Sequence, residues 1–257
     1  MIQRTFLQQL TEEGSKTMRV LAIDSSGLTA TVAVVEDEQT VAEYTVNYKK
    51  THSQTLLPMI DEVKKMIDLD LSSIDAIAVS GGPGSFTGLR IGSATAKGLG
   101  LALKKPLIAI PTVEGLAYNL YDISGLICPI MDARRKQVYT GIYRFTDHQL
   151  KVVEDQMAVP METVIEKLNQ YGEAVTFLGD GVSVFHELIA EKMTVPYSFA
   201  PAHVNKQRAA AVAALGEIYY RQGKTETAME HVPDYLRVSQ AERERAEREA
   251  AKADADS

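Results

Sequence analysis

The stretch SGGPGSFTGLRIG, residues 80–92, lies between two segments of different character. The apolar run IDAIAVS before it is typical of a buried central strand, and SATAKGLGLAL after it is typical of a helix. The three pieces together predict a strand, a glycine-rich turn and a helix. Backbone amides at a helix N-terminus attract anions, so a phosphate cradle is the first hypothesis for this loop.

Taken alone, the loop is a weak nucleotide-binding motif. It lacks the lysine of a Walker loop and the G-x-G-x-x-G spacing of a dinucleotide fingerprint. Asp24 and Ser25, after the strand-like run RVLAID, could hold a cation or a phosphate beside Gly82 and Gly84. The sequence DSSG is also an ordinary turn, so both interpretations remain open.

The helix after the loop carries small residues on one face. They recur at every fourth position, at Gly88, Gly92, Ala96 and Gly100. Each glycine in a helix costs roughly 1 kcal/mol relative to alanine, and close packing along a smooth face would offset that cost. The residues alone allow two neighbours for this face, another element of the same chain or a partner protein.

Upstream of the loop, the pattern predicts three antiparallel strands and a helix. RVLAIDSS, TATVAVVE and TVAEYTVNY read as the strands, with EDEQ as the turn between the last two. The helix begins after Ser53 as its N-cap, with Pro58 in or near the first turn. Its apolar positions include Leu56, Leu57, Ile60 and Val63.

Downstream, similar parts appear a second time. LICPIMDA and QVYTGIYRF read as a hairpin, METVIEKLNQYG as a helix, AVTFLGDG as a strand and NKQRAAAVAALGEIYYRQG as a closing helix. The repetition predicts two lobes, residues 18–110 and 111–237, with a closing helix that can return to the first lobe. The alternative is a single doubly wound sheet. Residues 1–17 read as a leader, either an alternative start or a short docking helix, and 238–257 as a charged tail.

Composition limits the class of protein. The chain has 257 residues, 45% of them hydrophobic, and a formal charge of -7, so any contact with nucleic acid has to be local. The single cysteine, Cys128, excludes an internal disulfide and fits a reducing compartment. The sequence has no apolar run of the roughly 18 residues that span a membrane, so a cytoplasmic protein is expected.

The sequence contains few candidate catalytic or ligand-binding residues. The five histidines are scattered singly, which argues against a metal site and against a nucleophile–histidine pair for Ser26 or Ser85. Arg134 and Arg135, in the sequence DARR, are candidates for binding a phosphate or a partner carboxylate. A surface ion pair of little energetic value is the alternative interpretation of these arginines.

Six motifs resemble a known family. IDSS, SGGPGSFTGLRIG, KPLIAIPTVEGLA, MDARRKQVY, GDG and PDYLR occur in the order and spacing of the TsaB (YeaZ-like) family, a subunit of the bacterial machinery that makes threonylcarbamoyladenosine in tRNA. The resemblance covers about residues 18–237. It implies an α/β fold of two ribonuclease-H-like lobes, of the acetate kinase, sugar kinase, Hsp70 and actin type. It also implies a paralogue of TsaD, the subunit that carries the transfer site.

The comparison with TsaD-like proteins implies a subunit without catalytic residues. Their metal-binding motif NHLEGH corresponds here to PTVEGL, which places Thr112 and Leu116 where the two histidines would stand. Leucine has no donor atom, and a threonine hydroxyl alone is a poor ligand. The acidic pair of their ETSCDET motif corresponds to Leu28 and Thr29. The resemblance therefore implies no metal, no cofactor bound by this chain alone and a vestigial nucleotide loop, and it leaves room for ATP or ADP at the boundary with a partner.

The resemblance also implies partners. They are a TsaD-like subunit, a TsaE-like ATPase subunit and, through the complex, tRNA. A homodimer through the same helix face is a further alternative when the partner is absent. The family pairs through helices of the first lobe, so the apolar and small residues of the two helices described above become interface candidates. An active nucleotide hydrolase or metallopeptidase of the same fold is the alternative function.

Overall fold

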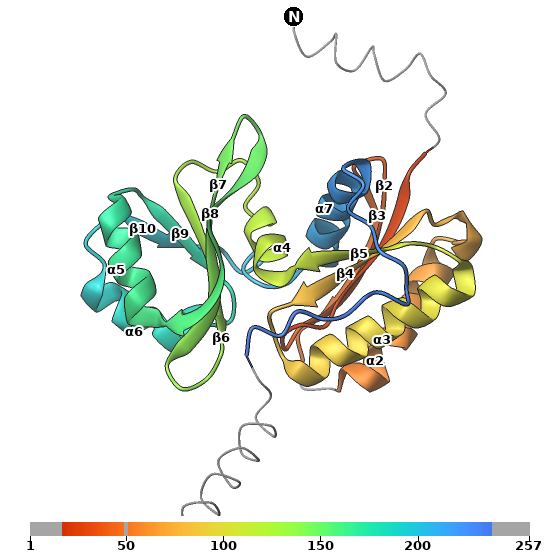
Figure 1. Cartoon of the computed structure of the whole chain (residues 1–257), viewed down its shortest axis with the longest axis horizontal. Coiled ribbons are helices and arrows are strands. Elements are labelled where there is room, and N and C mark those ends of the chain that lie inside the picture. Colours follow the sequence, from red (N-terminus) through yellow and green to blue (C-terminus); the bar gives the residue numbers. More distant parts are fainter. Residues whose placement is uncertain (1–16, 49–50, 238–257) are drawn as a thin grey trace, which may run out of the picture.

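The computed structural model describes residues 17–48 and 51–237, which form two α/β lobes side by side (Figure 1). Within them, each lobe is built on a five-stranded sheet, in the orders β3-β2-β1-β4-β5 and β10-β9-β6-β7-β8. The expected two-lobed α/β class is confirmed, and a single doubly wound sheet is excluded. Apart from Thr17, the predicted leader 1–17 lies outside the described residues, as does the predicted tail 238–257.

The first lobe opens with the three predicted antiparallel strands, followed by parallel ones. Its hairpin turns at Asp37 and Glu38, both of which have positive φ. The elements of this lobe, in chain order, are β1 (Arg19–Asp24), β2 (Ala30–Glu36), β3 (Gln39–Val46), α2 (His52–Met66), the 3-10 turn Leu71–Ser73, β4 (Ala76–Gly82), α3 (Phe86–Leu103) and β5 (Leu107–Pro111).

The start of α2 differs from the prediction. The helix begins at His52 with Thr51 as its N-cap, and no side chain caps its amides, so the predicted cap at Ser53 is wrong. Pro58 lies inside the helix, in its second turn, and its ring is exposed. Because no side chain caps the first turn, the helix is stabilised mainly by the packing of its apolar face.

Alternating residues of the first sheet face two separate cores. Leu21, Ile23 and their same-face neighbours pack against α2 and α3, whereas Val20 and Ala22 pack against α7 (Ala209–Arg221). Figure 1 shows α7 across the sheet from α2 and α3. The closing helix of the chain therefore covers the open face of the first lobe.

The second lobe repeats the plan of the first. An antiparallel meander is followed by parallel strands, with helices on both faces of the sheet. Sequence reasoning missed β8, α6 and β10. The elements are α4 (Thr112–Tyr118), β6 (Leu126–Asp132), β7 (Gln137–Thr146), β8 (Gln149–Pro160), α5 (Met161–Tyr171), β9 (Val175–Leu178), α6 (Val182–Lys192) and β10 (Tyr197–Phe199).

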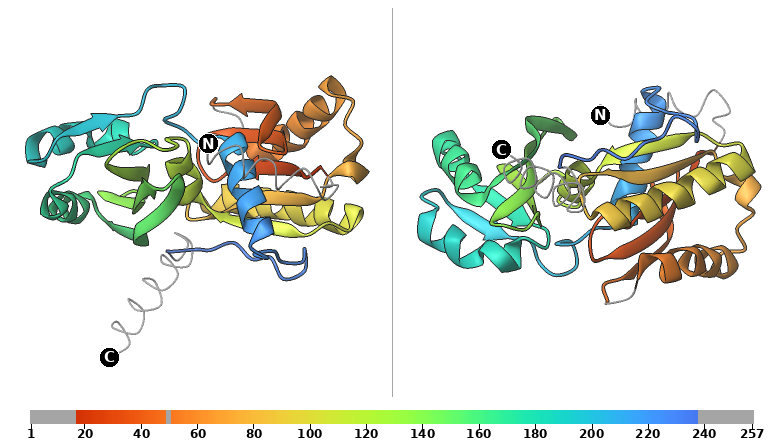
Figure 2. Two further views of the ribbon diagram at one scale, coloured as in Figure 1. Left: turned by 90° about the horizontal axis from the view of Figure 1, so that it is seen from above. Right: turned by 60° about the horizontal axis from the view of Figure 1, so that its bottom comes forward.

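After α7, residues 225–237 run back along the first lobe, and we call them the strap. Glu226 pairs with Leu107 at the free edge of β5. Lys97 of α3 then donates a hydrogen bond to the carbonyl of His231 at 2.9 Å. The strap ends at the second lobe, where Arg237 donates to the carbonyl of Ala133 at 2.6 Å. Both views in Figure 2 show this blue segment alongside α3.

Within the described residues, helix length and composition give no membrane-crossing candidate, because no helix is both long enough and apolar enough.

Candidate functional site

The glycine loop lies against the turn that follows β1. Ser85 caps α3 by accepting a hydrogen bond from the amide of Gly88, and its own amide donates to the carbonyl of Ser26 at 2.6 Å. The hydroxyl of Ser25 donates to the carbonyl of Gly88 at 2.9 Å. A Cβ at Gly84 would overlap the carbonyl oxygen of Ser26. The glycines of the loop thus permit close contact between two backbone segments.

Asp24 is buried beneath this contact. Its carboxylate accepts hydrogen bonds from the amide of Ser26 at 2.8 Å and from the Ser26 hydroxyl at 2.6 Å. Burial raises the pKa of Asp24 above its usual value, and the bonds from Ser26 partly oppose that effect. His52 closes the turn by donating from Nε2 to the carbonyl of Gly27 at 2.7 Å. The structure therefore places the predicted residues Asp24, Ser25 and Gly84 in two backbone segments that touch, whereas the neighbour of Gly82 is Asp234.

The strap fills the space over the loop. The amide of Asp234 donates to the carbonyl of Gly81 at 2.7 Å, and a Cβ at Gly82 would overlap the carbonyl of Asp234. The ring of Tyr235 packs 4.8 Å from that of Phe86, between centroids, at the start of α3. The loop thus contacts the chain's own backbone on both sides, which assigns its glycines to packing.

The stripe of small residues on α3 faces inward. Gly88, Gly92, Ala96 and Gly100 are all buried. A Cβ at Gly88 would overlap the Ser25 carbonyl, and one at Gly92 would lie 2.6 Å from the Ser25 hydroxyl oxygen. The prediction that these four residues form a partner interface is therefore wrong for this chain, because its own β1 turn, sheet and strap occupy that face.

The apolar residues of α2 divide in the same way. Leu56, Ile60 and Val63 are at most 5% exposed and belong to the core of the first lobe. Only Leu57, which is 57% exposed, remains available to a partner. The prediction of these four residues as interface is corrected to Leu57 alone, because the heptad-like spacing marks the face that packs on the chain's own sheet.

The opposite face of α3 presents a different small-residue surface. Ala94, Gly98 and Leu101 are exposed there, and a Cβ at Gly98 would meet no atom of residues 17–48 and 51–237 within 4 Å. We call these three residues the outer helix face; Leu57 of the neighbouring α2 is exposed as well. Sequence reasoning missed Gly98 because it lies off the four-residue spacing. The sequence could have indicated it, because Gly98 is a glycine within the predicted helix that does not belong to the series of small residues at every fourth position.

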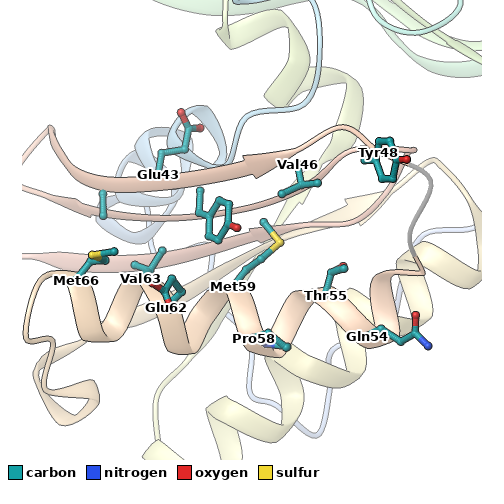
Figure 3. Close-up of a pocket in the computed structure, with 12 residues that line it drawn as sticks. Glu43, Val46, Tyr48, Gln54, Thr55, Pro58, Met59, Glu62, Val63 and Met66 are labelled. Carbon is teal, nitrogen blue, oxygen red and sulfur yellow. The ribbon is translucent and has the colours of Figure 1, made fainter.

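A groove of about 840 Å³ adjoins α2 on its other side. It lies between α2 and the edge strand β3, and Figure 3 shows Met59 and Val63 pointing from the helix toward the strand, with Tyr48 and Met66 at its two ends. Tyr48 and Met66 are 71% and 74% exposed. The groove is lined by Ala42, Glu43, Tyr44, Val46, Tyr48, Gln54, Thr55, Pro58, Met59, Glu62, Val63 and Met66. Exposed apolar side chains therefore gather around α2.

The positions that align with metal ligands lie elsewhere. Thr112 and Leu116 are buried in α4, each about 1% exposed. Among residues 17–48 and 51–237, no group of three or more histidine, cysteine or carboxylate side chains is placed to hold a metal ion. The residues at the aligned positions do not form a donor set suited to a transition metal.

Arg134 and Arg135 lie in the turn between β6 and β7. Together with Lys136 they have φ values of 65°, 54° and 59°, a left-handed conformation that costs a residue with a side chain about 1–2 kcal/mol. Arg134 contacts Asp132 twice, from its amide at 2.8 Å and from its guanidinium at 3.0 Å. The predicted alternative, a surface ion pair, is therefore present for Arg134.

Comparisons with known proteins agree with one another. The family model described as tRNA N6-adenosine threonylcarbamoyltransferase (TsaD) matches residues 39–245. The tRNA threonylcarbamoyladenosine biosynthesis protein TsaB of Bacillus subtilis is 35% identical over 88% of this chain and 96% of its own length. The protein of the same name from Escherichia coli is 32% identical, over 86% and 95%.

A solved structure shows the same architecture. YeaZ from Pseudomonas aeruginosa superposes with a TM-score of 0.73 at 25% identity, over 85% of this chain and 100% of its own. The similarity extends over both lobes, so it concerns the whole described fold.

Proposed function

The chain belongs to the TsaB family of tRNA threonylcarbamoyladenosine biosynthesis proteins, and on that basis we propose that it is a non-catalytic subunit that pairs with a TsaD-type transferase. The observation that carries the pairing is the outer helix face, where Gly98 is exposed and a Cβ on it would meet no atom of the described residues within 4 Å. An exposed helical glycine costs about 1 kcal/mol relative to alanine. Close approach of a partner helix would offset that cost.

The non-catalytic part of the proposal rests on the chemistry of the buried residues. Thr112 and Leu116 supply no pair of imidazoles, and the strap packs on the loop that would otherwise face a nucleotide. The catalytic groups then belong to the partner. In this assignment the complex, joined by a TsaE-type ATPase, transfers a threonylcarbamoyl group from its adenylate to the exocyclic amine of an adenosine beside the tRNA anticodon. With these proposed partners and tRNA the chain would act in the cytoplasm, and ATP or ADP would bind at a subunit boundary.

Replacing Gly98 with phenylalanine tests the pairing surface. The side chain has room in the isolated chain, so the fold should survive, whereas a partner helix would be pushed away. We expect the affinity for the transferase, measured by titration calorimetry, to fall at least tenfold. Ala190→Phe, at an exposed position of α6 in the second lobe, is the matched control and should leave the affinity unchanged. Equal affinities for the Gly98→Phe variant and the native chain would contradict the assigned surface.

The purified chain and transferase also test whether this chain is a non-catalytic subunit. A TsaD-type transferase that modifies tRNA at full rate without this chain would contradict the subunit role. ATP turnover by the purified chain, abolished by Asp24→Ala, would instead favour the alternative of an active hydrolase.

A further inference from the structure

Arg134, Arg135 and Lys136, which we call the basic turn, combine an unfavourable conformation with long cationic side chains. The hairpin turns at Asp37–Glu38 and Asp147–His148 also have positive φ. Three of those four residues are aspartate or histidine, types enriched in the left-handed region. The basic turn has only arginine and lysine, although glycine or asparagine would suit its backbone better.

The fold does not account for the choice of side chains. Arg135 and Lys136 are exposed. Within the described part of the chain their side chains make no hydrogen bond or ion pair. Arg134 contacts only Asp132, and its side chain is 85% exposed. Two cations are therefore held at the surface without a partner among residues 17–48 and 51–237.

Among the described residues, the nearby carboxylates form no ion pair with Arg135 or Lys136. Asp132 already bonds Arg134, and Asp180 accepts a hydrogen bond from the Asp132 amide at 3.1 Å. Asp234 accepts from the amide group of Gln156 at 2.5 Å. A further cation, Arg237 of the strap, adjoins the turn through its bond to the Ala133 carbonyl. In a chain of net charge -7, Arg135 and Lys136 thus stay exposed and without an ion pair among the described residues, where the strap meets the second lobe.

We propose that the basic turn binds the phosphate backbone of tRNA within the assembled complex. The proposal rests on the proposed function, which brings tRNA to the complex. Unpaired, exposed arginine and lysine side chains bind phosphates by charge-assisted hydrogen bonds, and such contacts position an RNA without reading its sequence. The contact is local, because the net charge of the chain as a whole repels phosphate.

The test uses the full chain mixed with its transferase and a fluorescently labelled, unmodified tRNA transcript. In the double variant Arg135→Gly, Lys136→Gly, we expect RNA affinity to fall on the order of tenfold and the slope of log affinity against log salt to decrease by about 2. The Tm should be maintained or rise, because glycine adopts positive φ without a Cβ clash. Weaker RNA binding by a fold of equal or greater stability separates a lost contact from unfolding.

Lys104→Gly is the matched control. Lys104 is exposed and left-handed, with φ of 56°, at the C-cap of α3, so this variant also removes a cation and relieves the same backbone conformation. It should leave RNA affinity unchanged. Equal affinity and salt slope for the double variant and the native chain would overturn the proposal. So would loss of co-elution with the transferase in the double variant, because the turn would then contact protein. If the native chain fails to co-elute, the proposed function fails separately, and the RNA titration of the mixture still decides the role of the turn.

Discussion

Two glycines in α3, ten positions apart, serve opposite purposes. Gly88 is buried against the Ser25 carbonyl, and Gly98 is exposed with open space around it. The same residue type therefore marks an internal contact at one position and a free surface at the other. Only the first is required by the isolated fold.

Alanine at these two positions should change stability in opposite directions. Gly88→Ala forces a Cβ into a backbone carbonyl and should lower the free energy of unfolding by about 3 kcal/mol. Gly98→Ala should raise it by about 1 kcal/mol, because alanine has the higher helix propensity and meets nothing. Urea unfolding of the two variants measures both changes. Changes of the same sign would refute the packing described here.

At the level of the elements, α7 shows how a segment from the end of the chain completes the first lobe. Its first turn is held by Glu43 of β3, which accepts hydrogen bonds from the Arg208 side chain and from the Ala210 amide. Further along the helix, Glu217 is about 1% exposed and accepts from the amide of Glu38 at 3.1 Å. Burial raises the pKa of Glu217, an effect that its hydrogen bond and the nearby Arg221 only partly oppose.

Glu217→Gln should therefore change the pH dependence of stability. A carboxyl whose pKa is raised on folding adds stability below its ordinary pKa, near 4.5, and that stability is lost as pH rises through the raised value. Removing the charge should make the variant more stable than the native chain at pH 8, with the difference in free energy of unfolding shrinking toward pH 5. Thermal unfolding across this range measures it.

Glu154→Gln is the control of opposite sign. Hydrogen bonds from the Tyr171 hydroxyl and from Lys167 lower the pKa of Glu154, so its contribution is present above its ordinary pKa and is lost as pH falls. This variant should be less stable than the native chain at pH 8, and the difference should shrink on acidification. Parallel profiles for the two variants would contradict the burial of Glu217.

For the whole molecule, the strap is the feature that joins distant parts. It pairs with the edge of β5, passes α3 and ends on the second lobe. Tyr235 packs on Phe86, and Arg90 lies 4.0 Å from the centroid of the same ring. The last described residues therefore join the two lobes, in addition to the contact of α7 with α4 through Tyr219 and Glu114.

Removing the side-chain contacts of the strap should loosen it without unfolding either lobe. In the double variant Tyr235→Ala, Arg237→Ala, the ring packing and the bond to Ala133 are lost, while both cores are untouched. We expect amide hydrogen exchange in residues 231–237 to become at least tenfold faster. Val232→Ala, which changes a 70% exposed residue of the same segment, is the control and should leave exchange unchanged. Native exchange rates in the double variant would show that backbone bonds alone hold the strap.

Local signals were enough to predict the repeating parts. The alternation of β1 to β3, the apolar run of β4 and the helix that becomes α3 each follow from spacing within a short window, and the second series of parts predicted the second lobe. The spacing of Gly88, Gly92, Ala96 and Gly100 correctly placed these residues on one face of a helix. The missed strand β8 shows no strict alternation of buried and exposed residues, whereas α6 was readable, because Val182, Phe185 and Ile189 recur at helical spacing.

Only the tertiary structure shows that the small-residue face of α3 points into the protein. Periodicity ranks residues around a helix axis, but it does not say whether the neighbour is the chain's own sheet or another protein. The neighbour of Gly88 is Ser25, 63 residues away, and that of Gly82 is Asp234 in the strap. SGGPGSFTGLRIG therefore specified a turn and a helix, and contacts between distant segments buried four of its five glycines and left Gly98, further along the helix, on the surface.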